Sequence, residues 1–233
     1  MRLTGSDFGA FSFTLGAFYA YREFDFAAPL YDVNIGLVGP DPVTGFTTDV
    51  LKLQNTKSET FSVFASMEIE LMEDLILAGG ARYTDESKTS RISVPFQHAF
   101  LAGSGAFLPS GFFSGPIDFD DDNISPEVTL RYQLADDISV FAAYKTGFKS
   151  GGIDVSALPT ASLDVSRQTG DFSDIIFASE ESEGFEAGIK SELFGRQLRL
   201  NVTAYRYEYS DLQIQLFDPV AIELDTLTDS ENT

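Results

Sequence analysis

The sequence from Ile124 to Gly152 reads as two strands joined by a turn that is too short to hold anything else. Apolar and polar side chains alternate from Val128 to Leu134 and again from Ile138 to Phe148. Such alternation gives a strand one apolar face and one polar face. Because only Ala135-Asp136-Asp137 separates the two arms, they must be antiparallel neighbours. The first constraint on the fold is therefore a hairpin whose arms have the length of tilted transmembrane strands.

The same period of two predicts five more strands along the chain. They are expected at roughly 8–24, 60–71, 75–86 and 185–193, and in a segment that opens at 198. Short turns are expected at Met72-Glu73-Asp74 and Phe194-Gly195-Arg196. At Tyr205 the alternation slips, which leaves two alternatives open. Either a β-bulge resets the register, or Arg206 and Glu208 already stand above a bilayer.

Between the hairpins the sequence predicts three long irregular loops, at about 25–56, 88–123 and 150–180. Loops of that length are unusual in a compact soluble domain. Outer-membrane barrels alternate short periplasmic turns with long extracellular loops, and closure pairs every backbone group in lipid. We therefore expect an all-β fold: about seven antiparallel strands of a transmembrane β-barrel. Seven is odd, whereas bacterial single-chain barrels have even strand numbers, so an interior piece of a larger barrel is expected.

The polar faces of the predicted strands carry charges of both signs. Two interpretations stay open: a ladder of cross-strand ion pairs lining a wet lumen, or a selective surface for a plug or an anionic solute. The cations of this face are Arg82, Arg131, Lys145, Lys149, Lys190 and Arg199. The opposite faces, which include Val128 and Val202, are expected to contact outer-membrane lipid.

The long loops are the expected place for a ligand, because three-residue turns have no spare side chains to build a site. The loop at 88–123 holds four candidate ligand-facing aromatics: Phe107, Phe112, Phe113 and Phe119. Its acidic run at 118–123 lacks the glycine and glutamate of an EF-hand loop, so we interpret it as a solvated loop end.

Composition excludes several functions. With 36 acidic against 15 basic residues the net charge is −21, which argues against nucleic acid as a partner. The chain has no cysteine, and His98 is its one histidine, so a zinc or haem site built from this chain is not expected. No nucleophile, histidine and acid form a convincing catalytic set, and no phosphate-binding loop is present. We predict no cofactor and no enzyme activity.

Three stretches resemble the barrels of TonB-dependent outer-membrane receptors. The segment SPEVTLRYQLADDISVFAAYKTGFKSGG at 125–152 is similar to their SP-x-V-x-L-x-Y, short turn, Y-x-x-GFKSGG pattern. The stretches 58–88 and 181–216 resemble the same family of barrels. The resemblance implies a barrel of about 22 strands in the bacterial outer membrane, preceded by a plug domain and an energy-coupling segment. It also implies uptake of a scarce solute, such as a ferric siderophore, cobalamin or a glycan, energised by the TonB complex. Residues 1–233 are then expected to be a partial barrel domain, with no signal peptide, plug or terminal strand.

A soluble all-β carbohydrate-binding domain is the alternative. Its apolar faces would pack sheet on sheet. Long loops count against it, and so do tyrosines placed near the ends of the apolar faces as membrane girdles require: Tyr19, Tyr83, Tyr132 and Tyr144.

Overall fold

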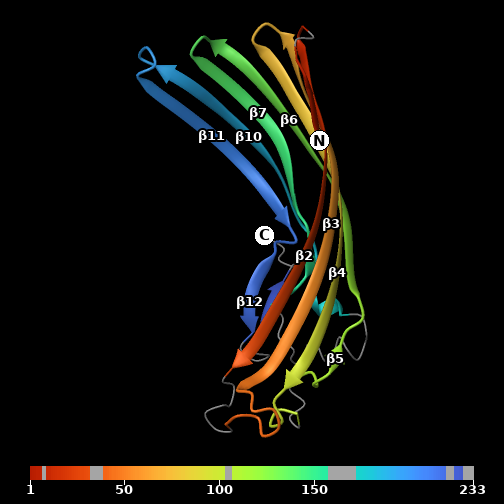
Figure 1. Cartoon of the computed structure of the whole chain (residues 1–233). Helices are drawn as coiled ribbons and strands as arrows, with labels where there is room; N and C mark the ends of the chain where they lie inside the picture. Colours follow the sequence, from red (N-terminus) through yellow and green to blue (C-terminus); the bar gives the residue numbers. More distant parts are fainter. Residues whose placement is uncertain (7–8, 32–38, 103–106, 157–171, 219–222, 228–233) are drawn as a thin grey trace.

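The computed structural model describes residues 1–6, 9–31, 39–102, 107–156, 172–218 and 223–227. Seven long strands form one antiparallel sheet in which strands follow one another in chain order. They are β2 (Phe11–Tyr31), β3 (Thr48–Met72), β4 (Leu75–Gln97), β6 (Ile117–Ala135), β7 (Ile138–Lys149), β10 (Glu180–Leu193) and β11 (Leu198–Ser210). Figure 1 shows them as a curved wall, with short turns at the top and longer connections at the bottom.

The sheet is open. A short strand that sequence analysis did not predict, β1 (Arg2–Gly5), pairs with β2 at one edge, and β11 forms the other. No pairing among the described strands joins these two edges. There is one curved wall rather than two sheets packed face to face, so the sandwich alternative is wrong.

Short elements fill the bottom end of the wall in Figure 1. The strand β5 (Phe112–Phe113) pairs with β4, and a single 3-10 turn, η1 (Ser173–Ile175), precedes β9. The two small sheets are β8 (Gly152–Ile153) with β9 (Ile176–Phe177), and β12 (Ile214–Asp218) with β13 (Glu223–Leu227). In the described part of the chain, no helix has the length and apolar character needed to cross a membrane.

The tight turns lie where the sequence predicts them. Glu73 and Asp74 connect β3 to β4, and Asp136 and Asp137 connect β6 to β7. The β10–β11 turn places Phe194, Gly195 and Arg196 all at positive φ, between 54° and 70°. Three consecutive residues in this region reverse the chain within a few residues, which fixes β10 and β11 as neighbours.

The outer face of the sheet carries the predicted apolar band. On β3 it runs from Phe61 to Leu71, the length that a tilted strand needs to cross a bilayer. Exposed fractions are 41–55% for Phe61, Val63, Met67, Leu71, Val128, Leu130, Leu200 and Val202. A continuous surface of exposed large apolar side chains requires an apolar medium, so this face contacts lipid.

The register of β10 against β11 decides between the two alternatives at Tyr205. Pairing is continuous from Glu181 opposite Ser210 to Leu193 opposite Leu198. No residue is inserted, so the bulge alternative is wrong. Arg206 and Glu208 share the outer face with Val202 and form an ion pair with an N–O distance of 2.7 Å.

The strands are much longer than the apolar alternation indicates, and the predicted loops are correspondingly too long. β2 continues to Tyr31, β3 begins at Thr48, β4 continues to Gln97 and β6 begins at Ile117. Beyond the apolar band the outer face of these strands is no longer held in lipid, so the sequence there loses its regular alternation although the backbone pairing continues. Hydroxyl side chains on adjacent strands support this pairing, as in the contact of Thr56 Oγ1 with Ser90 Oγ at 2.9 Å.

The acidic run at 118–123 is part of this extension, and the interpretation as a loop end is wrong. Every residue of the run lies in β6 and pairs with residues 84–89 of β4. Asp118, Asp120 and Asp122 are exposed on the outer face, and Thr89 Oγ1 donates to Asp118 Oδ1 at 2.7 Å. Within the described ranges, no three acidic or histidine side chains are grouped as metal ligands.

Candidate functional site

The inner face of β7, β10 and β11 holds a row of ion pairs. Lys145 Nζ lies 3.1 Å from Glu186 Oε2, and Tyr207 Oη donates to Glu186 Oε1 at 2.6 Å. Arg199 Nη2 lies 2.5 Å from Glu192 Oε1. Each pair joins neighbouring strands on one face, as the ladder interpretation predicts. Exposed pairs of this kind are worth at most about 1 kcal/mol each, so their main effect is to fix a polar lining.

Three more of the candidate lumen cations have mixed surroundings. Arg82 donates to Ser62 Oγ at 2.9 Å and lies over the Phe18 ring at 6.0 Å. Lys190 Nζ lies 5.2 Å from the centroid of the Phe141 ring. Arg131 lines a groove with Lys190 and Phe141. These three cations therefore present part of their charge to the lumen.

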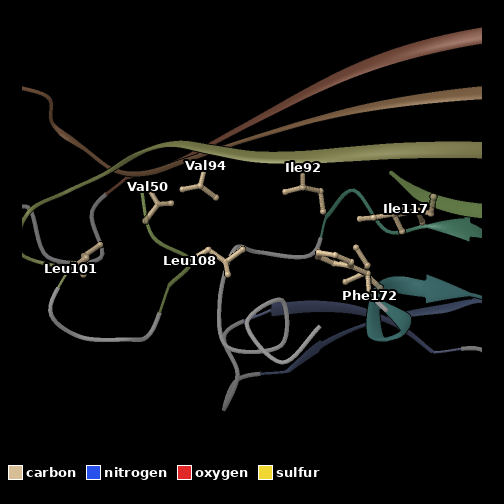
Figure 2. Close-up of a cluster of buried hydrophobic side chains, with 9 residues drawn as sticks. Val50, Ile92, Val94, Leu101, Leu108, Ile117 and Phe172 are labelled. Atoms are coloured by element: carbon tan, nitrogen blue, oxygen red, sulfur yellow. The ribbon is translucent and has the colours of Figure 1, made fainter. Parts of the chain in front are cut away.

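At the outer end of the wall, the inner face turns apolar. Figure 2 shows Val50 of β3 and Ile92 and Val94 of β4 pointing toward side chains from the later segments. The full buried cluster is Val50, Ile92, Val94, Leu101, Leu108, Ile117, Ile153, Phe172 and Ile175, and we call it the outer cluster. It anchors the segments that follow β4 and β7 against the inside of the wall.

The four candidate aromatics divide around this cluster. Phe107, Phe112 and Phe119 are half-buried and pack against it, and Phe112 and Phe119 lie in strands rather than in a loop. Phe113 is 65% exposed. Lys149, the remaining candidate cation, ends β7 near the same region and lies 3.5 Å from Glu180 Oε2.

Asp41 fastens the β2–β3 connection to the segment after β4. Its carboxylate accepts hydrogen bonds from the backbone of Val43 and Thr44 at 2.9 and 2.8 Å, and from the Ala99 backbone at 2.9 Å. His98 takes part, since its Nδ1 accepts from the Phe100 N–H at 3.1 Å while Nε2 lies 3.3 Å from Gly39 O. These contacts give His98 a structural role.

We expect Asp41→Asn to loosen the residue 98–102 turn at neutral pH. The hydrogen bonds, with that from Ala99 the largest contribution, hold the pKa of the Asp41 carboxyl below its ordinary range. A lowered folded pKa gives stability that is complete above the unfolded value of about 4 and is lost as the pH falls further. Asparagine can keep one acceptor, but its NH₂ group would face a second donor.

The measurement is amide hydrogen exchange of residues 99–102 in the full-length protein. Wild type should lose protection only in acid, and Asp41→Asn should lack it already at pH 7. Thr44→Val removes a single hydroxyl donor, 3.0 Å from Asp41 Oδ1, and should change exchange much less. Equal protection in wild type and Asp41→Asn would contradict the assigned role.

Sequence analysis missed three buried or half-buried polar residues of the inner face. Lys52 and Gln54 of β3 are 0% and 2% exposed, and Lys88 of β4 is half-buried. Lys88 Nζ donates to Ser150 Oγ at 3.0 Å and also to Gly151 O. Their partners lie far away in the sequence, so no local pattern marks these residues.

A family model described as TonB dependent receptor-like, beta-barrel matches residues 2–229. The ferric yersiniabactin uptake receptor FyuA from Yersinia pestis is similar in structure, with a TM-score of 0.67 and 16% identity over 91% of this chain. The ferric-catecholate import receptor Fiu from E. coli K12 gives a TM-score of 0.58 at 14% identity over 97% of the chain. The siderophore receptor PiuA from Acinetobacter baumannii gives a TM-score of 0.57, at the same identity and coverage.

No curated protein sequence matches the chain. The chain spans 28% of FyuA, 32% of Fiu and 33% of PiuA, which is about a third of each receptor. At these identities the solved structures establish the fold, and the family model establishes the membership. The chain therefore belongs to the TonB-dependent receptor family and forms part of the wall of an outer-membrane β-barrel.

Proposed function

We propose that the full-length protein imports a scarce solute, such as a ferric siderophore, using energy supplied through TonB. The observation that carries this proposal is the division of the wall into a lipid-facing outer side, a polar inner lining and an outer cluster that holds long segments at the mouth. The similar solved receptors are described as a ferric yersiniabactin uptake receptor, a ferric-catecholate import receptor and a siderophore receptor, which puts ferric chelates ahead of cobalamin or a glycan. The role is transport rather than catalysis.

The chain's part in that function is a partial barrel domain, residues 1–233, around a plug domain of the same protein. Three inner-face cations present part of their charge to the lumen: Arg82, Arg131 and Lys190. They are proposed to contact the plug or an anionic solute. Phe113 is proposed to contact the solute as it approaches the mouth, because Phe113 is the exposed member of the four candidate aromatics and lies on the side of the wall opposite to the outer cluster. The other three keep the mouth in shape by packing on the outer cluster.

Uptake by intact cells tests the proposal. Cells with and without the full-length receptor would be given iron-55 as ferric catecholate or ferric hydroxamate, and in parallel labelled cobalamin and a labelled glycan. We expect receptor-dependent uptake of a ferric chelate that stops when a protonophore removes the proton gradient. Receptor-dependent uptake that persists without the gradient would overturn the energy coupling. Uptake of cobalamin or glycan alone would change the solute class.

Phe113→Ala should weaken solute binding to the same cells about tenfold, the size of one aromatic contact of roughly 1.4 kcal/mol. The amount of folded receptor, measured by heat-modifiable migration, should stay unchanged. Phe112→Ala is the matched comparison, since its side chain packs inward and its loss should reduce folding of the mouth instead. Unchanged binding in Phe113→Ala would remove this residue from the site.

A further inference from the structure

Three residues after β8, Asp154, Val155 and Ser156, lie over the inner face of β3, and we call them the strap. Lys52 Nζ donates to the Val155 carbonyl at 3.1 Å, and Gln54 Nε2 donates to the Asp154 carbonyl at 3.2 Å. Under the strap Lys52 and Gln54 are 0% and 2% exposed. Two strongly polar side chains are thus buried, with backbone carbonyls of the strap among their hydrogen-bond acceptors.

The strap leaves one buried polar atom beneath it without a hydrogen-bond partner among the described residues. Gln54 Nε2 has a second acceptor in Ser90 Oγ at 2.9 Å, but the buried Gln54 Oε1 has no hydrogen-bond partner among the described residues. The strap backbone offers carbonyl acceptors here and no donor that reaches this oxygen. A buried acceptor without a donor destabilises the closed arrangement.

Lys52 adds to the cost of closure. Its burial lowers the pKa of the ammonium group to about 8, while the negative charge of Asp154 acts in the opposite direction. At neutral pH the group is still mostly protonated, so a cation is held out of water with backbone carbonyl contact. Opening of the strap would return that cation to solvent at the mouth of the lumen.

The strap has a fold of its own, and its root is fixed separately. Asp154 Oδ1 accepts from both the backbone N–H and the hydroxyl of Ser156, each at 2.6 Å. Before the strap, the Gly151 N–H donates to Ser179 Oγ at 2.8 Å, and a Cβ at Gly151 would lie 2.3 Å from Phe177 O. The root is therefore tightly packed. The strap itself is held by Lys52 and Gln54 from below, by the hydrogen bond from the Asp154 N–H to Ile175 O at 2.7 Å, and by Gln215 Nε2, which donates to Ser156 Oγ at 2.9 Å.

We propose that the strap is an autoinhibitory element that occupies, as an internal ligand, a binding site formed by Lys52 and Gln54, and that a hydroxycarboxylate solute displaces it. A carboxylate would replace the Val155 carbonyl at Lys52, and a second oxygen would accept from Gln54 Nε2. A hydroxyl would donate to Gln54 Oε1, which the strap leaves unpaired. This inference rests on the proposed transport function and names the chemistry of one solute-binding site within it.

The first experiment measures closure without any ligand. Full-length receptor in outer-membrane vesicles is treated with an amine-reactive reagent, and labelling of each lysine is measured by mass spectrometry. Lys57 of the same strand, whose side chain is 45% exposed, is the internal reference. Lys52 should label at least tenfold less than Lys57 in wild type and approach Lys57 in Asp154→Ala or in the milder Ser156→Ala. Equal labelling of the two lysines in wild type would contradict the proposal that the strap covers Lys52.

The second experiment tests the site in the Ser156→Ala receptor with citrate and tricarballylate, which differ only by the citrate hydroxyl. Citrate should protect Lys52 from labelling, and tricarballylate should need about tenfold higher concentration because Gln54 Oε1 then stays unpaired. In Ser156→Ala with Gln54→Leu the two compounds should become equivalent. Equal protection before that substitution, or none, would overturn the assigned ligand chemistry. Neither readout depends on uptake, so transport can fail or succeed independently.

Discussion

Replacing Ala142 with arginine is expected to lower the free energy of unfolding of the full-length receptor in lipid by about 2–4 kcal/mol. Ala142 is exposed on the outer face, opposite Leu130 of β6 and Ala187 of β10. These neighbours place it within the apolar band, where a guanidinium has no water and no acceptor. The measurement is denaturant unfolding of receptor in lipid vesicles.

Ser139→Arg is the matched control on the same strand. Ser139 lies on the inner face and lines a polar groove with Asp136, Asp137 and Glu192. An arginine there can stay hydrated and meet carboxylates, so the change in unfolding free energy should stay below about 0.5 kcal/mol. If Ser139→Arg destabilised the receptor more than Ala142→Arg, the two faces would have been assigned the wrong way round.

The part of the fold that the bilayer constrains was predictable from the sequence. In the apolar band one face must be apolar and the other polar. The alternation alone therefore indicates that Val128 faces lipid and that Thr129 faces the lumen. The tight turns were also predictable, because two or three residues between alternating segments leave one way to connect them. Family membership follows from the same hairpins, and the match over residues 2–229 confirms it.

Outside the bilayer that constraint is gone. Asp85 and Asp122 lie directly opposite each other in β4 and β6, although aspartate is disfavoured in strands. Backbone pairing propagated from the membrane region fixes them there. A reading based on apolar alternation therefore ends each strand too early and gives loops that are too long.

The candidate site was predictable only for residues whose positions follow from the alternation of their own strand. The lumen cations follow from strand alternation, and the structure places Lys145 and Arg199 in the expected cross-strand pairs. Lys52 and Gln54 look like ordinary polar residues of a strand, and their burial depends on a segment about a hundred positions later in the chain. Such a contact leaves no signal in either segment alone.

The outer cluster leads to the second large effect, which is expected for Leu108→Ala. Leu108 is fully buried between the wall and the later segments, as Figure 2 shows. Removing a large buried side chain costs about 2–5 kcal/mol, because the packing lost is only partly recovered by relaxation. That cost falls on docking of the segment after β4, since the transmembrane strands do not contain this residue.

Two amides report the docking directly. Gly111 N–H donates to Val94 O and Ser114 N–H donates to Ile92 O, each at 2.8 Å. In the full-length receptor, hydrogen exchange at these amides should become about thirtyfold faster or more in Leu108→Ala, while amides of the apolar band keep their protection. Phe113→Ala removes a larger side chain from the same segment, but that side chain points away from the cluster and is 65% exposed, so exchange should stay near wild type. Equal acceleration in both variants would mean that the segment is held by its backbone pairing to β4, and that the outer cluster adds nothing to the shape of the mouth.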